Sequence, residues 1–297
     1  MIGEFAALGA AISWAVAPLF YRNALEDTNP VSANIVRCVT NGLVLTVLLV
    51  ASGTVGVLAS LPTWVILVAI VSGAIGLGVG DTLYMLGLKT IGVSRAVPLA
   101  STYPLFSLLW AVLFLNQPLS FMTLTGAAII LLGIWLLSKK NSQSSDAKGK
   151  RLLTGVLASL ATAVAWSASL TLMDAVFASG ISGLDANYAI VTVRIASLAV
   201  MLTAFSPFID RNRNFLKITR KTLITLCVGG LVANGLGWLL INYSFLYIPE
   251  TQAVPISSTS PLFAALAGFL FFKEKATWFS TVGAVAVVAG IFLIFLV

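Results

Sequence analysis

The sequence predicts an all-α membrane protein with ten transmembrane helices arranged as two inverted five-helix repeats. Three observations predict this fold: an extreme composition, ten long apolar stretches, and halves that carry the same residues at a constant offset. Of the 297 residues, 59% are hydrophobic and only 9% are charged, against about 25% charged in soluble domains. Too few polar side chains remain to cover a soluble surface. The composition therefore excludes a soluble enzyme, a disordered chain and a disulfide-linked secreted domain.

The ten stretches follow one another with short connections. A transmembrane helix needs about 20 mainly apolar residues to cross about 30 Å of hydrocarbon. The stretches that qualify are 4–21, 31–51, 64–88, 95–115, 119–137, 152–178, 184–206, 222–247, 251–272 and 276–296. Proline lies in three connections, at Asn29-Pro30, Leu61-Pro62 and Gln117-Pro118, and it suits a helix start because it has no amide hydrogen to leave unpaired.

The two halves resemble each other at an offset of 157 residues. This offset pairs Arg37 with Arg194 and the segment 96–106 with 253–263. It also pairs four glycines with glycines: Gly73 with Gly230, Gly80 with Gly237, Gly126 with Gly283, and Gly133 with Gly290. We therefore expect one repeat at 4–138, a flexible polar linker at 139–151 and a second repeat at 152–297. Because each repeat holds an odd number of spans, the second is inverted, as is common in secondary transporters.

The charges of the loops predict the orientation. One face of the ten spans has no Lys or Arg in its loops. The other face carries Arg22, Lys89, Arg95, Lys139, Lys140, Lys148, Lys150, Arg151, Arg211, Arg213, Lys217, Arg220, Lys221, Lys273 and Lys275. The positive-inside rule puts the basic face in the cytoplasm of a plasma-membrane protein and both termini outside. The pI of 9.6 is thus explained by orientation, and we expect no nucleic-acid partner.

The sequence lacks the residues that several kinds of catalytic, metal-binding and cofactor-binding sites require. The chain has no His, which excludes most triads and His-ligated metal sites. Cys38 and Cys227 lie in apolar runs, as small buried side chains do. The glycines of 76–80 do not form a phosphate loop, because no strand precedes them; they predict close helix approach. With no Walker motif or nucleophile elbow either, we expect no enzyme, no cofactor and no metal.

The paired repeats carry a family resemblance. Trp14 matches Trp166 at an offset of 152, because the second half has five extra residues before its second span. The resembling features are these two tryptophans, the two arginines, Ala-Val-Pro at 96–98 and 253–255, Pro-Leu-Phe at 104–106 and 261–263, and the last two glycine pairs. On these features the chain resembles the drug/metabolite transporter superfamily, in particular its EamA-type ten-span exporters and permeases. Members often have a Glu after the fourth helix of each unit; Glu274 fits, but Gln117 stands in the first unit. The resemblance implies alternating-access transport of a small organic solute, with members commonly drawn with cytoplasmic termini.

Three ionisable residues inside spans are candidate functional groups, because such groups are costly in a membrane. Arg37 and Asp81 lie at similar depths, about 9 and 10 Å from the cytoplasmic face at about 1.5 Å per residue. We expect an ion pair or a shared water site, with a structural pair or Arg37 reaching the headgroups as alternatives. Asp81 is our candidate for proton coupling. Arg194 has Trp238 at the mate position of Asp81, so it is a candidate receptor for a carboxylate or phosphate; pairing with helix-end carbonyls or Asp174 is the alternative.

The proline-containing fourth and ninth spans are further candidates. Their prolines, Pro98, Pro104, Pro255 and Pro261, leave carbonyls free that lipid cannot satisfy. The nearby polar side chains are Ser101, Thr102, Tyr103, Gln252, Ser257, Ser258, Thr259 and Ser260. They either contact a solute or donate back to the kinked helices. On the eighth span Asn234, Trp238 and Asn242 recur every four residues, which predicts one polar-aromatic face for solute contact or for core packing.

These patterns favour a secondary-active transporter of a small organic solute such as a metabolite, an amino acid or a drug-like molecule. We place the site near mid-membrane between the third, fourth, eighth and ninth spans. The partners we expect are the solute, the lipid bilayer and a coupling proton or ion; the oligomeric state stays open. The alternatives are a flippase for lipids or lipid-linked head groups and, less favoured, a channel or an integral membrane enzyme. The enzyme is disfavoured because no His, Asp or Lys cluster lies at an interface.

Overall fold

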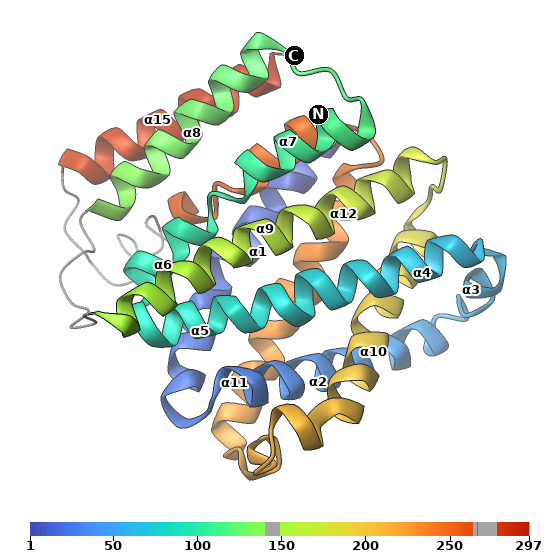
Figure 1. The fold of residues 1–297 in the computed structure, drawn as a ribbon. Helices are drawn as coiled ribbons and strands as arrows, with labels where there is room; N and C mark the ends of the chain where they lie inside the picture. Colours follow the sequence, from blue (N-terminus) through green and yellow to red (C-terminus); the bar gives the residue numbers. More distant parts are fainter. Residues whose placement is uncertain (140–148, 264–265, 267–277, 297) are drawn as a thin grey trace.

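The computed structural model describes residues 1–139, 149–263, 266 and 278–296, and every regular element in these ranges is helical (Figure 1). Six helices of this part are long and apolar enough to cross a membrane: Pro30–Ala51, Thr63–Ile91, Arg95–Leu115, Lys150–Ala178, Leu184–Ile209 and Arg220–Ser244. Shorter apolar helices lie at Ile2–Pro18, Phe121–Leu136 and Thr281–Phe295. The predicted all-α membrane fold is confirmed at this level. Most of the predicted linker and part of the span 251–272 lie outside the described residues.

The helices follow the predicted stretches closely. The first half holds α1 (Ile2–Asp27), α2 (Pro30–Ala51), α3 (Gly56–Ser60), α4 (Thr63–Ser72), η1 (Gly73–Gly80), α5 (Asp81–Ile91), α6 (Val93–Ala100), α7 (Tyr103–Leu115) and α8 (Phe121–Lys139). The second half holds α9 (Lys150–Ala178), α10 (Leu184–Ile209), η2 (Asn214–Lys217), α11 (Arg220–Gly230), η3 (Leu231–Gly237), α12 (Trp238–Ser244), α13 (Glu250–Ser257) and α15 (Trp278–Phe295). One difference from prediction is α1, which continues past residue 21 to Asp27.

The start of α2 shows why the sequence folds this way locally. Asn29 is the N-cap, and its side-chain oxygen accepts a hydrogen bond from the backbone N–H of Ser32 at 2.8 Å. Pro30 follows as the first helical residue. The cap satisfies one of the free amides of the first turn, and the proline removes another.

The third span of each half contains a π-helical segment at the same position in the repeat, η1 in one half and η3 in the other. Wide π turns are rare and often occur at functional sites. The glycines of η1 permit very close packing. A Cβ added to Gly76 would lie only 2.4 Å from the Ser169 hydroxyl oxygen, and one added to Gly80 would lie 2.8 Å from the Trp166 ring. These glycines therefore allow η1 to pack directly against α9, as the sequence predicted.

Contacts between the halves occur in exchanged pairs. A Cβ on Gly73 would meet Arg194, and one on Gly230, the repeat mate of Gly73, would meet Arg37, the mate of Arg194. The same exchange links Gly80 to Trp166 and Gly237 to Trp14, and it links Gly126 to Gly290 and Gly133 to Gly283. The last two pairs join α8 to α15, which lie side by side at one edge of the molecule (Figure 1).

The fourth span of each half is broken after its first proline. α6, with Pro98 inside it, ends before the turn at Ser101 and Thr102, and α13, with Pro255 inside it, ends before the turn at Ser258 and Thr259. Thus the predicted continuous helix 95–115 is two helices, because a proline removes a hydrogen bond and crowds the preceding turn.

The two ends of the bundle hold different residues. At one end Lys89 Nζ donates to the Thr28 carbonyl at 2.6 Å and Arg151 Nη2 donates to the Lys89 carbonyl at 3.4 Å, so the basic loops meet. At the other end Gly3 lies against Ile248. This agrees with the segregation of basic loops that the sequence predicts; which end faces the cytoplasm stays a prediction.

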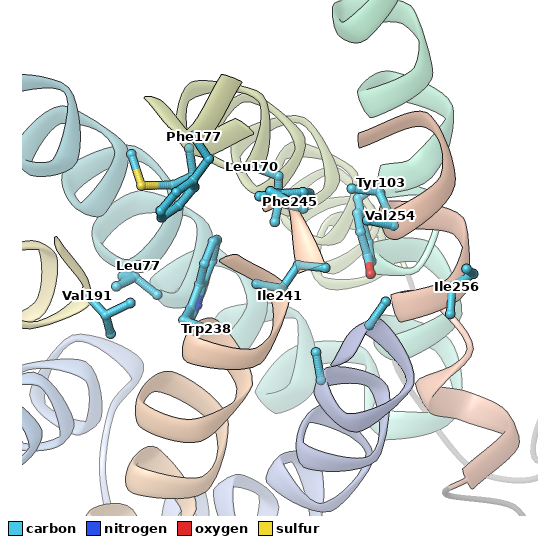
Figure 2. Packing of buried hydrophobic residues seen from close by; sticks show 14 of the residues in the cluster. Leu77, Tyr103, Leu170, Phe177, Val191, Trp238, Ile241, Phe245, Val254 and Ile256 are labelled. Carbon is cyan, nitrogen blue, oxygen red and sulfur yellow. The ribbon is translucent and has the colours of Figure 1, made fainter. Parts of the chain in front are cut away.

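The interior is apolar around a few aromatic rings. One buried cluster extends over both halves and includes Leu77, Tyr103, Val191, Trp238 and Ile241. Figure 2 shows the Trp238 ring within this cluster, near Leu77 and Ile241. The polar residues described next lie among these side chains.

Candidate functional site

Arg37 and Asp81 form a buried ion pair. Arg37 Nη2 lies 2.6 Å from Asp81 Oδ2, and both side chains are almost fully buried. The second carboxylate oxygen accepts from Trp166 Nε1 at 2.7 Å. Arg37 also donates to Tyr21 at 3.2 Å and to Asn34. Of the two alternatives for Arg37, the one that reaches the headgroups does not occur, because the guanidinium is enclosed by these partners.

Arg194 lies in a different environment although it is the repeat mate of Arg37. It is completely buried, and its guanidinium carbon lies 3.8 Å above the centre of the Trp238 ring. Its hydrogen bond is from Nη2 to the Ser169 hydroxyl at 2.9 Å, while Nε and Nη1 have no partner. Among the described residues, no carboxylate lies within ion-pair distance of it.

The alternative partner considered for Arg194, Asp174, is engaged elsewhere. Its Oδ2 accepts a hydrogen bond from Gln117 Nε2. Asp81 acts on Arg194 through space, although it is bound to Arg37 and Trp166. Asp81 is thus the ion-pair partner of Arg37 and not of Arg194.

Unpaired amides lie on η3, on α12 and on the facing α2. Asn234 Nδ2, both amide atoms of Asn242 and both amide atoms of Asn41 are buried without a hydrogen-bond partner. A buried amide without a partner costs about 1–3 kcal/mol. Trp14 lies beside this face, because its ring is 5.9 Å from that of Trp238 and its Nε1 donates to the Ala233 carbonyl at 3.0 Å. The region therefore combines a free cation, free amides and two indole rings.

The hydroxyls of the broken spans are used inside the protein. Thr102 Oγ1 donates to the Leu99 carbonyl, Ser258 Oγ to the Pro255 carbonyl and Thr259 Oγ1 to the Ile256 carbonyl, each at 2.7 Å. Ser257 Oγ likewise donates to the Val254 carbonyl at 2.9 Å. Of the two alternatives for these hydroxyls, solute contact or donation back to the kinked helices, the structure has the second. Ser101, Pro104 and Pro261 are buried and Pro98, Gln252 and Ser260 half-buried.

Tyr103 connects the two broken spans. Its hydroxyl lies 3.0 Å from Ser257 Oγ, and its ring is 6.1 Å from that of Trp166. Trp166 in turn holds Asp81. The structure thus brings Tyr103 near the Arg37–Asp81 pair, whereas the hydroxyls of Thr102, Ser258 and Thr259 bond within their own spans.

Sequence reasoning missed several polar residues of the interior. Asn34, Asn41 and Ser169 contact the arginines or lie beside them. The Glu250 amide donates to Asp174, and the Glu250 side chain accepts from Thr171. Gln117, noted in the sequence only at the family's Glu position, donates to Asp174. Their positions follow no regular spacing. The one available signal was that an amide or a carboxylate inside a membrane span needs a partner.

A cleft of about 500 Å³ opens at the basic end of the bundle. It is lined by Asn29, Pro30, Val31, Thr82, Leu86, Phe208, Ile209, Asp210, Arg211, Asn212 and Asn214. Its wall reaches the interior at Thr82, whose hydroxyl accepts from Asn34 Nδ2 at 2.8 Å. Asn34 also accepts a hydrogen bond from Arg37, so two hydrogen bonds connect the cleft wall to the ion pair.

One carboxylate lining this cleft is held by three donors. Asp210 accepts from Ser32 Oγ at 2.7 Å, from the Phe215 amide at 3.0 Å and from Asn214 Nδ2 at 3.1 Å. Burial alone raises the pKa of Asp210, but these hydrogen bonds more than offset it, so its pKa lies below the usual value. Asp210 thereby fixes the loop after α10 to the start of α2.

The chain matches the model of the EamA-like transporter family over residues 1–139 and 153–296. It belongs to this family. The EamA-like transporter described here is 27% identical over 300 residues to a protein of Archaeoglobus fulgidus that is named an uncharacterized transporter, with 100% of this chain and 96% of that protein covered. A crystal structure of a protein with 15% identity has a TM-score of 0.77 and covers 99% of this chain and 98% of that one. The latter shows a shared fold.

These findings confirm the family that the sequence resembles. The family and the apolar helices make this EamA-like transporter a multi-pass membrane protein, and they point to transport rather than to enzymatic catalysis.

Proposed function

We propose that this protein is a secondary-active transporter that moves a small organic anion across the plasma membrane by alternating access. The observation that carries the proposal is Arg194, a fully buried guanidinium with two nitrogens free. A buried charge without a counterion is strongly destabilising. A carboxylate or phosphate on the solute supplies that counterion, and the planar fork of arginine binds either group with two hydrogen bonds.

The neighbours of Arg194 suit the organic part of such a solute. Trp238 and Trp14 present ring faces and edges, and Asn234 and Asn242 present free amides. Apolar and aromatic walls with a few polar groups that fix orientation are typical of small-molecule sites. We therefore place the anionic group at Arg194 and the rest of the solute toward α12.

The exchanged contacts support two inverted repeats. A contact between residue i of one half and residue j of the other recurs between their mates, as in the glycine pairs of α8 and α15. Such exchange is what a two-fold axis produces. The two family matches, at 1–139 and 153–296, agree with repeats at 4–138 and 152–297. Repeats of this kind allow two related states, one open to each side.

The cleft at the basic end is our proposed route to the cytoplasm. The positive-inside rule puts this end in the cytoplasm and the termini outside. Thr82 and Asn34 then separate the cytoplasmic water from the Arg37–Asp81 pair. In this proposal the ion pair is the inner boundary of the solute site, with Arg194 beyond it.

A thermal-shift screen of purified protein tests the proposal. The panel holds small carboxylates, phosphate esters, amino acids, sugars and amines. A ligand that binds only the folded state stabilises it by about 2.7 kcal/mol at 100 times its Kd. We expect stabilisation by anions only, its loss in Arg194→Gln, and partial loss in Arg194→Lys, which keeps the charge without the fork.

The control is Arg220→Gln, which removes an exposed guanidinium from the start of α11. It should respond to anions as the wild-type protein does. Stabilisation by amines or neutral sugars, or an anion response that survives Arg194→Gln, would refute the anion site. Water-soluble lipid head groups are included in the same panel. Stabilisation by these head groups would indicate a flippase, and stabilisation by other anions would indicate a transporter of water-soluble anions.

A further inference from the structure

Two carboxylates lie buried together near the end of the bundle that holds the termini. Asp174 is 2% exposed on α9, and Glu250 is 0% exposed at the first residue of α13. The backbone amide of Glu250 donates to the Asp174 carboxylate, which brings the two side chains together. Among the described residues, no Lys or Arg lies within ion-pair distance of either one.

Hydrogen bonds fix both carboxylates but do not satisfy them. Asp174 accepts from Gln117 Nε2 and from the backbone amide of Glu250. Gln117 Oε1 accepts from the Thr251 amide at 3.3 Å, which holds the start of α13 in place. Glu250 Oε1 accepts from Thr171 Oγ1 at 2.8 Å. These donors are neutral, so neither negative charge is balanced.

Two atoms beside the pair lack a hydrogen bond. Glu250 Oε2 is buried without a partner, and so is the hydroxyl of Ser107, a fully buried residue on α7. The Ser107 hydroxyl faces the Glu250 carboxylate and interacts with it, without reaching full hydrogen-bond geometry. Glu250 Oε2 therefore has room for a proton, and the Ser107 hydroxyl beside it can accept a hydrogen bond from a protonated carboxyl or donate one to an ionised carboxylate.

The other elements packed on α13 bring no compensating charge. α1 contributes Glu4, whose carboxylate is paired with the N-terminal ammonium at 2.8 Å. α7 contributes the Tyr103 hydroxyl, which is bonded to Ser257. α12 contributes Tyr243, bonded to Tyr247, and α15 carries no ionisable side chain in its described range. α8 also packs on α13, and its one ionisable residue is Lys139, the last residue of that helix. Asp174 and Glu250 therefore face each other as the charged groups of this region.

We propose that Asp174 and Glu250 form a proton-binding dyad and that release of its proton opens the outer end of α13. Two neighbouring buried carboxylates without a counterion disfavour double ionisation strongly, so one carries a proton. The proton binds Glu250 Oε2, from which it donates to Ser107 Oγ, and on opening it passes to water and leaves two carboxylates that repel. The proposal rests on the proposed transport function, for which it names the coupling ion.

α9 connects this dyad to the anion site. The same helix carries Ser169, which binds Arg194, and Thr171 and Asp174, which bind the start of α13. Less than two turns separate Ser169 from Asp174, at 3.6 residues per turn. A movement of α9 away from α13 thus acts on both sites. Asp81, our first candidate for proton coupling, is instead bound by Arg37 and Trp166.

Infrared titration and hydrogen exchange test the dyad without a transported solute. In the wild-type protein we expect a protonated carboxyl band at neutral pH that disappears on alkalinisation. We also expect backbone hydrogen exchange at the start of α13 to rise with pH, after correction for its intrinsic pH dependence. If opening releases one proton, the exchange rate rises by up to about tenfold per pH unit at pH values above the pKa of the dyad.

Three variants separate the dyad from general effects. Glu250→Gln should lose both the band and the pH-dependent exchange. Asp174→Asn should move the titration to lower pH, because the negative neighbour is gone. Glu4→Gln, a carboxylate change near the same end but outside the dyad, should leave both measurements unchanged.

Three outcomes would overturn the proposal. They are exchange of α13 that does not depend on pH, a Glu4→Gln variant that behaves like Glu250→Gln, and stabilisation by LiCl or NaCl that requires Glu250, which would mean a metal cation in place of the proton. The anion panel tests the transported solute independently. A failure of the dyad is therefore distinct from a failure of the proposed function.

Discussion

The two halves of the molecule treat the same arginine in opposite ways. Arg37 and Arg194 occupy equivalent positions, and so do their partners Asp81 and Trp238. In the first half a carboxylate balances the guanidinium. In the second half an indole ring stacks on it and leaves two of its nitrogens free. The matching arginines therefore form a closed ion pair in one half and leave an unsatisfied guanidinium in the other, where Trp238 stands in place of a carboxylate.

The two tryptophans that approach these positions differ in the same way. Trp166 Nε1 donates to a charged oxygen, Asp81 Oδ1, whereas its mate Trp14 donates to a neutral one, the Ala233 carbonyl. The comparison predicts which substitutions are costly in the first half and tolerated in the second.

The largest expected effect follows loss of the balanced arginine. Arg37→Leu leaves Asp81 buried with Trp166 as its donor and should destabilise the protein by about 3–5 kcal/mol. Unfolding in detergent, followed by tryptophan fluorescence, measures this. The double variant Arg37→Leu with Asp81→Leu removes both charges and should regain much of the loss. A single variant as stable as the wild-type protein would show that the pair contributes nothing.

The tryptophans should differ by a smaller amount. Trp166→Phe removes a hydrogen bond to a carboxylate and should cost about 2 kcal/mol, while Trp14→Phe removes one to a carbonyl and should cost about 1 kcal/mol. The same unfolding measurement compares them, with each variant as the control for the other. Equal losses would mean that ring packing, rather than the charge of the acceptor, sets the effect.

The unbalanced arginine should tolerate removal. Arg194→Leu eliminates a buried charge without a counterion and sacrifices its stacking on Trp238, so the stability without ligand should change by less than about 1 kcal/mol. A loss as large as that of Arg37→Leu would show that Arg194 has a structural counterion, and it would contradict the comparison.

The smallest expected effect concerns Asp210, which bonds the loop after α10 to the start of α2 and has no counterpart in the first half. Asp210 has Gly53 at its mate position. Because the folded pKa of Asp210 is lowered, its contribution to stability is present above the ordinary pKa of a carboxyl and is lost as pH falls through the folded value. The difference in Tm between wild type and Asp210→Asn should therefore narrow below about pH 4. Asp185→Asn, an exposed change on the same helix, is the control; a difference that does not depend on pH would contradict the prediction.

Much of this architecture could be predicted from the sequence. The apolar lengths predicted the spans, and equal depth on two helices predicted that Arg37 and Asp81 could meet. That Arg194 lacks a counterion followed from Trp238 in the mate position. These inferences need only helix geometry and the constant offset.

Other features could not be predicted in this way. The grouping of Asp174, Gln117 and Glu250 depends on how three spans far apart in the sequence lean together at one end, and no periodicity encodes that. The sequence does not distinguish whether the hydroxyls of Thr102, Ser258 and Thr259 face a solute or bond to their own helix. The local backbone geometry decides the direction of each hydroxyl, and here each one donates to the nearest carbonyl of its own helix.

The π-helical segments have a mechanical consequence. Asp81 and Trp238 each come directly after such a segment, η1 or η3. A π turn holds about one residue more than an α turn, so slipping that residue out would rotate everything beyond it by about 100°. One such rotation would carry Asp81 off Arg37, and the other would carry the indole off Arg194. Each arginine therefore lies opposite a π-helical segment at which its span could rotate.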